Sequence, residues 1–419
     1  MSIASFTKNK PLSSALNKLA NCDVSNLFIW TTIASNVSSS LAQCWGILKN
    51  PENDEKRKSF LLKQECAECF LNITSYFLLT KACFGKMANK LVESGKVLSK
   101  KVVNKAAENK IDITDFKKVS EWGMDHVRIP VDYNVVQNDD LSFKEDGFTR
   151  IEKCIEYCKK YNLNMILDLH KTLGFSFDDG ENEDGFFTDE KYQENFYSLW
   201  LELTRRFSKY KDMLAFELLN EVTDIEYKDV WNKIASECIN RIRKTSNIKI
   251  LVGGYYNNAV SAIKDIDVPI DDNIVFNFHC YEPLIFTHQG AYWIDGMDTK
   301  FRFKYDSTFK EVIEKTKEQD LYYPGDYSFM DQDEKIGKHY FEVIFKEAIE
   351  TAEKKNVSLY CGEYGVIEYV SAEDTKKWYV DINSVLNKYG IGHALWSYRE
   401  MDFDFVNPRL DEVRKDIIG

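Results

Sequence analysis

Short apolar runs alternate with longer amphipathic segments from Ile111 to the end of the chain. Apolar runs of four to eight residues are typical of buried strands, and apolar residues repeated every three or four positions are typical of helices. The expected strands are residues 125–131, 163–168, 214–219, 248–253, 274–278, 357–361 and 393–396. The expected helices are residues 113–122, 147–161, 192–207, 230–243, 334–354 and 373–388.

This alternation predicts an α/β fold with a parallel sheet wrapped by helices. The strands are apolar throughout, which is typical of a sheet buried on both faces. Seven strands are visible, one fewer than a (β/α)8 TIM barrel contains, and no first strand is recognisable before Ile113. We therefore expect a TIM barrel over residues 111–419. Either a piece of the preceding segment, such as residues 27–33, supplies the missing strand, or the barrel is incomplete.

Residues 1–110 have a different composition. They hold 16 Lys and Arg against 8 Asp and Glu, whereas the whole chain carries a net charge of -12. Residues 56–73 and 87–109 are expected to be helical, and the second helix is basic and amphipathic. A membrane-surface role and a solvated face on a packed helix are both open. We expect an atypical, basic and mainly helical N-terminal segment here.

The overall composition limits the classes of partner. The acidic net charge argues against nucleic acid, and no apolar run reaches the roughly 18 residues of a membrane span. Met1 to Ala20 contains three lysines and no apolar core, so no secretory signal is recognisable. A lone Cys66–Cys69 pair is a weak metal or redox motif, and no metal or cofactor is expected.

Two glutamates close separate apolar runs. Glu221 follows Asn220, directly after the apolar run 213–219. Glu363 follows Gly362, directly after the apolar run 359–361. Each could simply cap a strand. Two carboxylates at the carboxyl ends of two barrel strands are also what a retaining glycosidase needs, because one protonates the leaving oxygen and the other attacks the anomeric carbon.

Other polar and aromatic residues fall at the ends of the expected strands. Any one of them could be structural, but together they occupy the barrel face on which such folds carry out chemistry. The candidate site residues on different strands are Arg128, His170, Asn220, Glu221, His279, Tyr281, Glu363 and Trp396.

The segment from about 113 to 405 resembles glycoside hydrolase family 5, the cellulase family, and within it the bacterial endoglucanase C type. The motifs that carry the resemblance are GMDHVRIPVDY (123–133), YCKKYNL (157–163), AFELLNE (215–221), NFHCY (277–281), YCGEYGVI (360–367) and KW (377–378). They occur in the order and spacing of that family.

The resemblance implies a role for each site residue. Glu221 would be the general acid/base, Glu363 the nucleophile, and Asn220 the partner of the sugar 2-OH. Arg128 and Tyr281 would lie beside Glu363, since cations and donors favour a carboxylate. His170 and His279 would line the scissile bond, and Trp396 would form the floor. We also expect the charge of Glu363 to raise the pKa of Glu221.

A long segment, residues 282–333, separates the sixth barrel strand from the next helix. Loops of this length are usually functional, so we expect a small, partly helical insertion in which Trp293 either contacts sugar or only packs.

The implied function is that of a monomeric, retaining endo-β-1,4-glucanase acting on cellulose or mixed-linkage β-glucan. The alternatives are an inactive or carbohydrate-binding protein with an incomplete barrel, or specificity for mannan or xyloglucan. A polysaccharide substrate suggests that the protein acts outside the cell. No secretory signal that would support this location is recognisable.

Overall fold

The computed structural model describes residues 111–419, apart from residues 139, 179–183, 322–326 and 400. Asp112–Gly419 form one compact unit. The expectations for residues 1–110, including their helices and the candidate strand at 27–33, lie outside the described residues.

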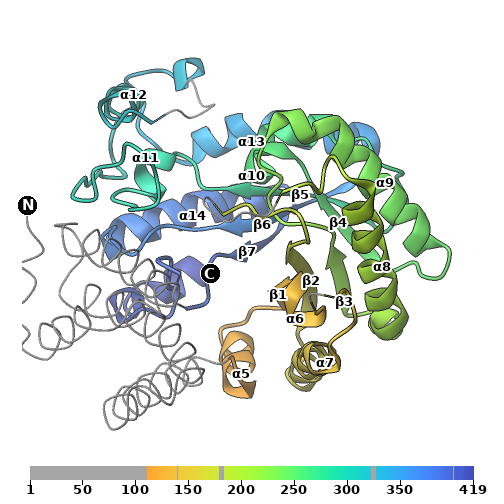
Figure 1. Cartoon of the computed structure of the whole chain (residues 1–419). Coiled ribbons are helices and arrows are strands. Elements are labelled where there is room, and N and C mark those ends of the chain that lie inside the picture. The colour runs from red at the N-terminus through yellow and green to blue at the C-terminus, as the bar shows by residue number, and fades with distance from the viewer. Residues whose placement is uncertain (1–110, 139, 179–183, 322–326, 400) are drawn as a thin grey trace, which may run out of the picture. The chain divides into compact units, whose positions relative to one another are not determined.

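All seven predicted strands are present, and they form one parallel sheet in sequential order (Figure 1). The strands are β1 (His126–Asp132), β2 (Asn164–Lys171), β3 (Leu214–Glu217), β4 (Lys249–Gly253), β5 (Ile274–Cys280), β6 (Ser358–Tyr364) and β7 (Gly392–Leu395). The sheet curves into a nearly closed barrel, so the predicted TIM-barrel architecture is confirmed.

Helices follow the strands and surround the sheet. The six predicted helices are α5 (Ile113–Glu121), α7 (Glu145–Lys160), α8 (Glu190–Phe207), α9 (Lys228–Arg243), α13 (Lys338–Lys355) and α14 (Ala372–Lys388). Short helices that the hydrophobic pattern did not predict are α6 (Tyr133–Val136), η3 (Ser208–Tyr210), η4 (Ile225–Tyr227), α10 (Tyr255–Asn258), η5 (Val260–Asp265), η7 (Pro408–Leu410) and α15 (Arg414–Ile418). Among the described helices, none combines the length and apolarity that crossing a bilayer requires.

Local sequence signals set several helix ends. Asp112 caps α5 by accepting from the Thr114 N–H, and Asp115 bonds back to the Asp112 N–H. Ser371 caps α14, and α13 ends at Asn356 in the left-handed conformation. These residues satisfy backbone groups that a helix leaves without partners, so the helices begin and end at defined residues.

The sheet has two faces with different contents. Residues such as Leu167 and Phe216 point outward into the large core beneath the helices. The alternate residues form a small separate apolar cluster of Ile166, Ala215, Leu251, Val275 and Tyr360, contributed by β2 to β6. Because side chains alternate along a strand, this cluster lies inside the barrel. Two residues further along, the same face carries Asp168, Glu217 and Asn277, all fully buried.

The two outer strands are the open part of the barrel. In the part of the chain that the structure describes, β1 pairs with β2 alone and β7 with β6 alone. Side chains connect the two regions instead: Tyr398, just after β7, donates to Asp115 of α5 over 3.0 Å, and Arg399 forms an ion pair with Asp115 at 3.0 Å. Whether residues 1–110 donate an eighth strand lies outside the described residues.

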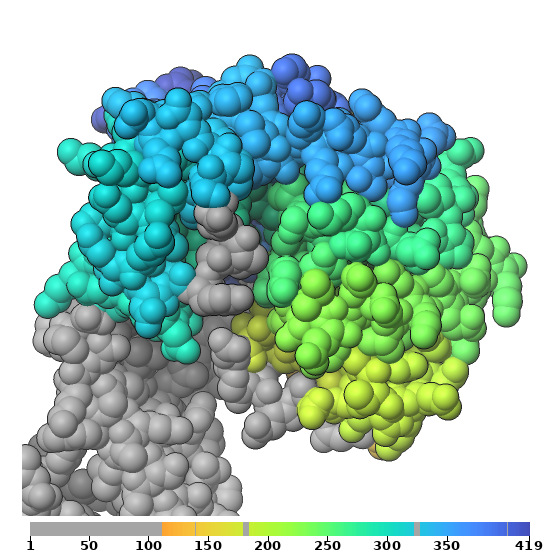
Figure 2. Space-filling model, turned by 90° about the horizontal axis from the view of Figure 1, so that it is seen from above, coloured from red at the N-terminus to blue at the C-terminus, as the bar shows by residue number. Residues whose placement is uncertain are grey.

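The expected insertion joins β5 to α13. It contains α11 (Leu284–Thr287), α12 (Phe309–Glu318) and η6 (Tyr327–Phe329). It packs on the barrel through Tyr305, which donates to Asp381 of α14 over 2.9 Å, and through Asp306, which pairs with Lys377 at 2.8 Å. Figure 2 shows a hollow between this insertion, in teal and cyan, and the green part of the chain that includes α9.

Replacing Gly362 by Ala is expected to destabilise the barrel. A Cβ at this position in β6 would lie 2.5 Å from Oδ1 of the buried Asn277. Asn277 cannot turn away without losing its 2.8 Å hydrogen bond to Glu217. Overpacking of this kind costs about 1–3 kcal/mol of unfolding free energy, which denaturant titration would measure.

Gly337→Ala provides the matched control, because its backbone is extended and the nearest atom to an added Cβ is 3.8 Å away. Equal stabilities of the two variants would contradict this account of Gly362.

Candidate active site

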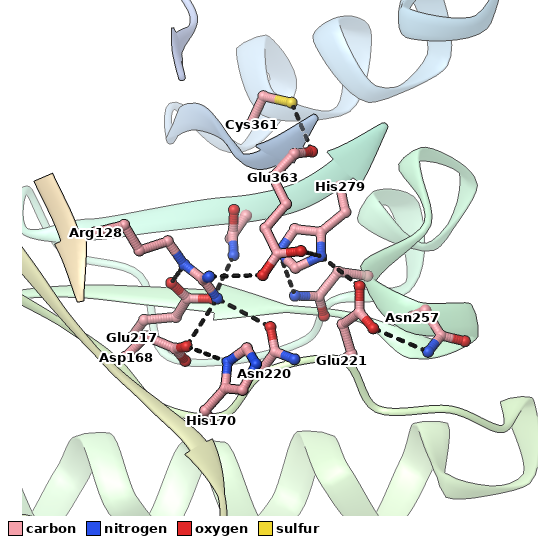
Figure 3. Close-up of polar contacts among 12 residues, drawn as sticks. Arg128, Asp168, His170, Glu217, Asn220, Glu221, Asn257, His279, Cys361 and Glu363 are labelled. Atoms are coloured by element: carbon pink, nitrogen blue, oxygen red, sulfur yellow. Dashed lines mark hydrogen bonds and ion pairs between the residues drawn. The ribbon is translucent and has the colours of Figure 1, made fainter. Parts of the chain in front are cut away.

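The structure brings together the residues that the sequence predicted. Arg128 lies in β1, His170 near the end of β2, and His279 near the end of β5. Asn220 and Glu221 follow β3, Tyr281 directly follows β5, Glu363 lies near the end of β6, and Trp396 directly follows β7. Figure 3 shows the polar members of this group converging from different strands.

Arg128 is the centre of the site. Its side chain is 3% exposed, and its Nε and Nη2 donate to the two oxygens of Glu217 over 2.6 and 2.8 Å. The guanidinium also pairs with Asp168 at 3.0 Å and with Glu363 at 2.7 Å. Burial alone would lower the pKa of Arg128, but the three carboxylates outweigh burial and hold that pKa well above its ordinary value.

Glu363 is held by three groups. Arg128 Nη1 donates to one oxygen over 2.7 Å, and the Tyr281 hydroxyl donates to the other over 2.8 Å. His279 Nδ1 lies 3.7 Å from that second oxygen. These donors fix the orientation of the carboxylate and favour its ionised form, which is the form that nucleophilic chemistry uses.

Glu221 has a different environment. His279 Nδ1 lies 2.7 Å from its Oε1, and Asn257 Nδ2 donates to its Oε2 over 3.1 Å. Burial raises the pKa of Glu221 to about 7. The expectation that the charge of Glu363 causes this shift was wrong. Loss of water is the largest cause, since only 13% of the side chain is exposed, and the neighbouring carboxylate that adds to the rise is Asp168.

The two histidines have opposite tendencies. Burial lowers the pKa of His279 to about 4, so its ring is neutral at neutral pH and can donate one Nδ1 proton toward Glu221. Burial also opposes a charge on His170, but the Asp168 carboxylate at 2.7 Å outweighs it and raises the pKa of His170. His279 therefore acts as a neutral donor, while His170 tends toward the imidazolium form.

Asn220 is poised to bind a ligand. Its Oδ1 accepts from Arg128 Nη2 over 2.9 Å, so its amide group is oriented by the central arginine. The Nδ2 atom is buried and has no hydrogen-bond partner among the described residues. A buried donor without a partner costs free energy, which a sugar hydroxyl at this point would recover.

The two tryptophans lie on different walls. The Trp396 ring stacks on His170, with centroids 5.6 Å apart. Trp293 is 39% exposed and belongs to the insertion, where its ring meets His288 and Phe403. Phe403 in turn contacts Tyr281, the partner of Glu363, so Trp293 is linked to the site through one intervening ring.

Four polar residues of the site were missed by the sequence analysis: Asp168, Glu217, Asn257 and Asn277. Asp168, Glu217 and Asn277 are charged or amide residues within otherwise apolar strands, and that break in the pattern was the signal that could have identified them. Asn257 lies in α10, the short turn after β4, where the sequence pattern carries no such signal.

Three residues of the site also have the chemistry of metal ligands. One ligand atom from each of Glu221, His279 and Glu363 lies within 4.8 Å of the others. The same three side chains have the separations and donors that acid/base and nucleophilic chemistry requires, so a metal is not needed to explain the cluster.

The model of the cellulase family, glycosyl hydrolase family 5, matches residues 93–402. The chain belongs to this family. It is 47% identical over 285 residues to cellodextrinase A of Ruminococcus flavefaciens, covering 68% of this chain and 77% of that protein. It is 37% identical over 311 residues to endoglucanase C of Acetivibrio thermocellus, covering 73% and 89%. The predicted family is confirmed, and the protein is a glycoside hydrolase.

Solved structures agree on the fold of this family member. The cellulose synthase subunit Z of Clostridioides difficile aligns with a TM-score of 0.58 at 26% identity, covering 74% of this chain and 91% of that one. Cel5A of Thermotoga maritima, solved with cellobiose, aligns with a TM-score of 0.58 at 23% identity, covering 74% and 89%.

The pKa of Glu221 predicts the pH dependence of the enzyme. Its folded pKa is about 7, above the ordinary value, so the carboxyl is protonated below that pH and ionised above it. If Glu221 is the acid, kcat/KM on an unactivated oligosaccharide should fall about tenfold per pH unit above pH 7. Glu221→Gln removes the titrating group, so its residual activity on an activated aryl glycoside should be level through pH 7. A level wild-type profile up to pH 9 would contradict the assignment.

Proposed function

We propose that the protein is a retaining endo-β-1,4-glucanase that hydrolyses internal bonds of cellulose or mixed-linkage β-glucan by double displacement. The observation that carries this proposal is the separation of the two glutamates, since one oxygen of Glu221 lies within 4.8 Å of one oxygen of Glu363. Carboxyl groups about 5–5.5 Å apart are typical of retaining enzymes, whereas inverting enzymes keep about 6.5–9.5 Å for a water.

In the first step, an oxygen of Glu363 attacks the anomeric carbon while Glu221 gives its proton to the glycosidic oxygen. The bond between that carbon and the leaving oxygen breaks, and a glycosyl ester on Glu363 forms. Asn220 Nδ2, which has no partner among the described residues, would donate to the sugar 2-OH. That hydrogen bond strengthens as positive charge develops on the ring.

In the second step, the ionised Glu221 takes a proton from water. The resulting hydroxide character lets the water oxygen attack the anomeric carbon, and the ester to Glu363 breaks. The released carboxylate returns to Arg128 and Tyr281, whose donors lie 2.7 and 2.8 Å from it. Both glutamates then have their starting protonation states.

The names of the relatives indicate two possible lengths of substrate. One relative is named a cellodextrinase and another an endoglucanase, so short soluble oligomers and long chains are both represented. Cutting of carboxymethylcellulose, measured as a fall in viscosity, would separate internal cleavage from action on cellodextrins.

Substitution of each glutamate should have a different outcome. Glu363→Ala should abolish turnover of every substrate, because the attacking oxygen is lost. Glu221→Ala should reduce hydrolysis of cello-oligosaccharides by about 10²- to 10⁴-fold, but spare the first step on aryl cellobiosides with good leaving groups, which need no acid. A burst of released phenol followed by slow turnover would report this difference.

Glu350→Ala is the control for loss of a surface carboxylate, since this side chain on α13 is 64% exposed. Equal losses of the burst in the Glu221 and Glu363 variants would show that the roles are assigned wrongly.

Substitution of Trp293 tests whether the insertion contacts the substrate. We expect Trp293→Ala to raise KM for long cello-oligosaccharides more than for short aryl glycosides, because an exposed indole offers a stacking face to a sugar beyond the cleavage point. Phe329→Ala is the comparison variant, because Phe329 is also an exposed aromatic of the insertion, at 54% against 39% for Trp293. If Trp293→Ala lowers only the yield of folded protein and leaves both KM values unchanged, Trp293 serves packing.

A further inference from the structure

The loop after β4 has an unusual backbone. Tyr256, Asn257 and Asn258 have φ values of 50, 55 and 57°, so three successive residues with side chains are left-handed. Single asparagines adopt this region readily, but a run of three residues that includes a tyrosine is retained only where the surrounding structure or the function requires it. None of the three positions uses a glycine, which would have avoided the cost.

Two residues of the left-handed turn contact the active site or the residue next to it. The Asn257 N–H donates to the Val222 carbonyl over 3.0 Å, directly after Glu221. Asn258 is fully buried, and its Nδ2 lies 3.4 Å from His279 Nε2. Gly253 leaves the space for this amide, because a Cβ there would lie 2.1 Å from Asn258 Oδ1.

The turn therefore touches both partners of the Glu221 carboxyl. It supplies one donor directly, through Asn257 Nδ2 at 3.1 Å from Oε2. It also contacts the other donor, His279, whose Nδ1 lies 2.7 Å from Oε1. Figure 3 shows Asn257 approaching Glu221 from the side opposite Glu363.

We propose that Asn257 is a positioning residue for the proton transfer by Glu221, and that the left-handed turn exists to present its amide to Oε2. This inference rests on the proposed function, in which Glu221 is the acid/base. Asn257 does not contact the scissile bond in this scheme. It acts by holding the carboxyl plane and by stabilising the carboxylate that remains once the proton has moved to the leaving oxygen.

The effect of Asn257 on the pKa of Glu221 has a defined direction. Burial raises the pKa of Glu221, and the hydrogen bond from Asn257 opposes that rise. Removing the donor should therefore raise this pKa further and move the alkaline limb of the pH profile to higher pH. The other titratable groups around this carboxyl come from four other strands or the residues after them: Arg128, Asp168, His170, His279, Tyr281 and Glu363. Substitution of Asn257 changes none of them.

Two variants distinguish the effect of the Asn257 amide group from that of its left-handed backbone. Asn257→Gly removes the side chain and relieves the left-handed backbone, whereas Asn257→Ala removes the same amide and keeps the strain. If the amide matters, both should lower kcat on cello-oligosaccharides by about tenfold, with little change in KM or in the first step on an activated aryl cellobioside. If Asn257→Gly keeps wild-type kcat and pH profile, the proposal is overturned.

Asn356 is the matched control. It is also exposed and left-handed, with φ 51°, and it ends α13. Asn356→Gly and Asn356→Ala should reproduce any change in stability that comes from a left-handed asparagine, without altering kcat or the pH profile. A loss of kcat in the Asn356 variants as large as in the Asn257 variants would refute a specific role.

A measurement without turnover distinguishes this proposal from the proposed function. The titration of Glu221 can be followed by NMR of protein labelled with ¹³C at the glutamate carboxyl groups, with Glu221→Gln identifying its signal. The midpoint should move to higher pH in Asn257→Gly and stay in place in Asn356→Gly. An unmoved midpoint in Asn257→Gly refutes the positioning role. A moved midpoint in a protein that hydrolyses no glucan refutes only the assigned activity.

Discussion

The buried guanidinium of Arg128 is the interaction on which the rest of the site depends. Three carboxylates, Asp168, Glu217 and Glu363, lie within 3.0 Å of it and come from three other strands. Buried charges are tolerated only when they are paired and hydrogen-bonded, so each strand must keep its register for the others to be stable. The same cation orients Asn220, the candidate partner of the substrate. The ionic centre of the site therefore depends on the register of four strands.

The inward face of the sheet is organised in layers that explain how one barrel carries both stability and chemistry. Apolar residues from β2 to β6, four of them aliphatic and one the aromatic Tyr360, fill the lower layer. The ionic layer around Arg128 lies above it, and Glu221 and His279 lie at the mouth. Exposure to solvent rises along this series, since Glu217 is fully buried while 13% of the Glu221 side chain is exposed. Solvent reaches Glu221, whereas both oxygens of Glu217 accept hydrogen bonds from Arg128 or Asn277.

Most of the fold could be predicted from the sequence because the spacing of apolar residues and the length of apolar runs are local properties of the chain. All seven strands and six helices follow from them, as do the two candidate glutamates that close strands. What could not be predicted depends on contacts distant in the chain. Asn257 reaches Glu221 only through the path of a left-handed turn, and the cause of the Glu221 pKa shift is a degree of burial that no short motif encodes. Residues 282–333 were recognised by their length, but their packing on α14 was not.

The open edge of the sheet has a consequence for how activity is lost. Within the described residues, β7 pairs with β6 only, and it leads directly into Trp396. Outer strands separate from a sheet at lower free energy than the strands in its middle. Warming should therefore loosen β7 and displace Trp396 before the strands that surround Arg128 separate. Heat inactivation and global melting would then be two different transitions.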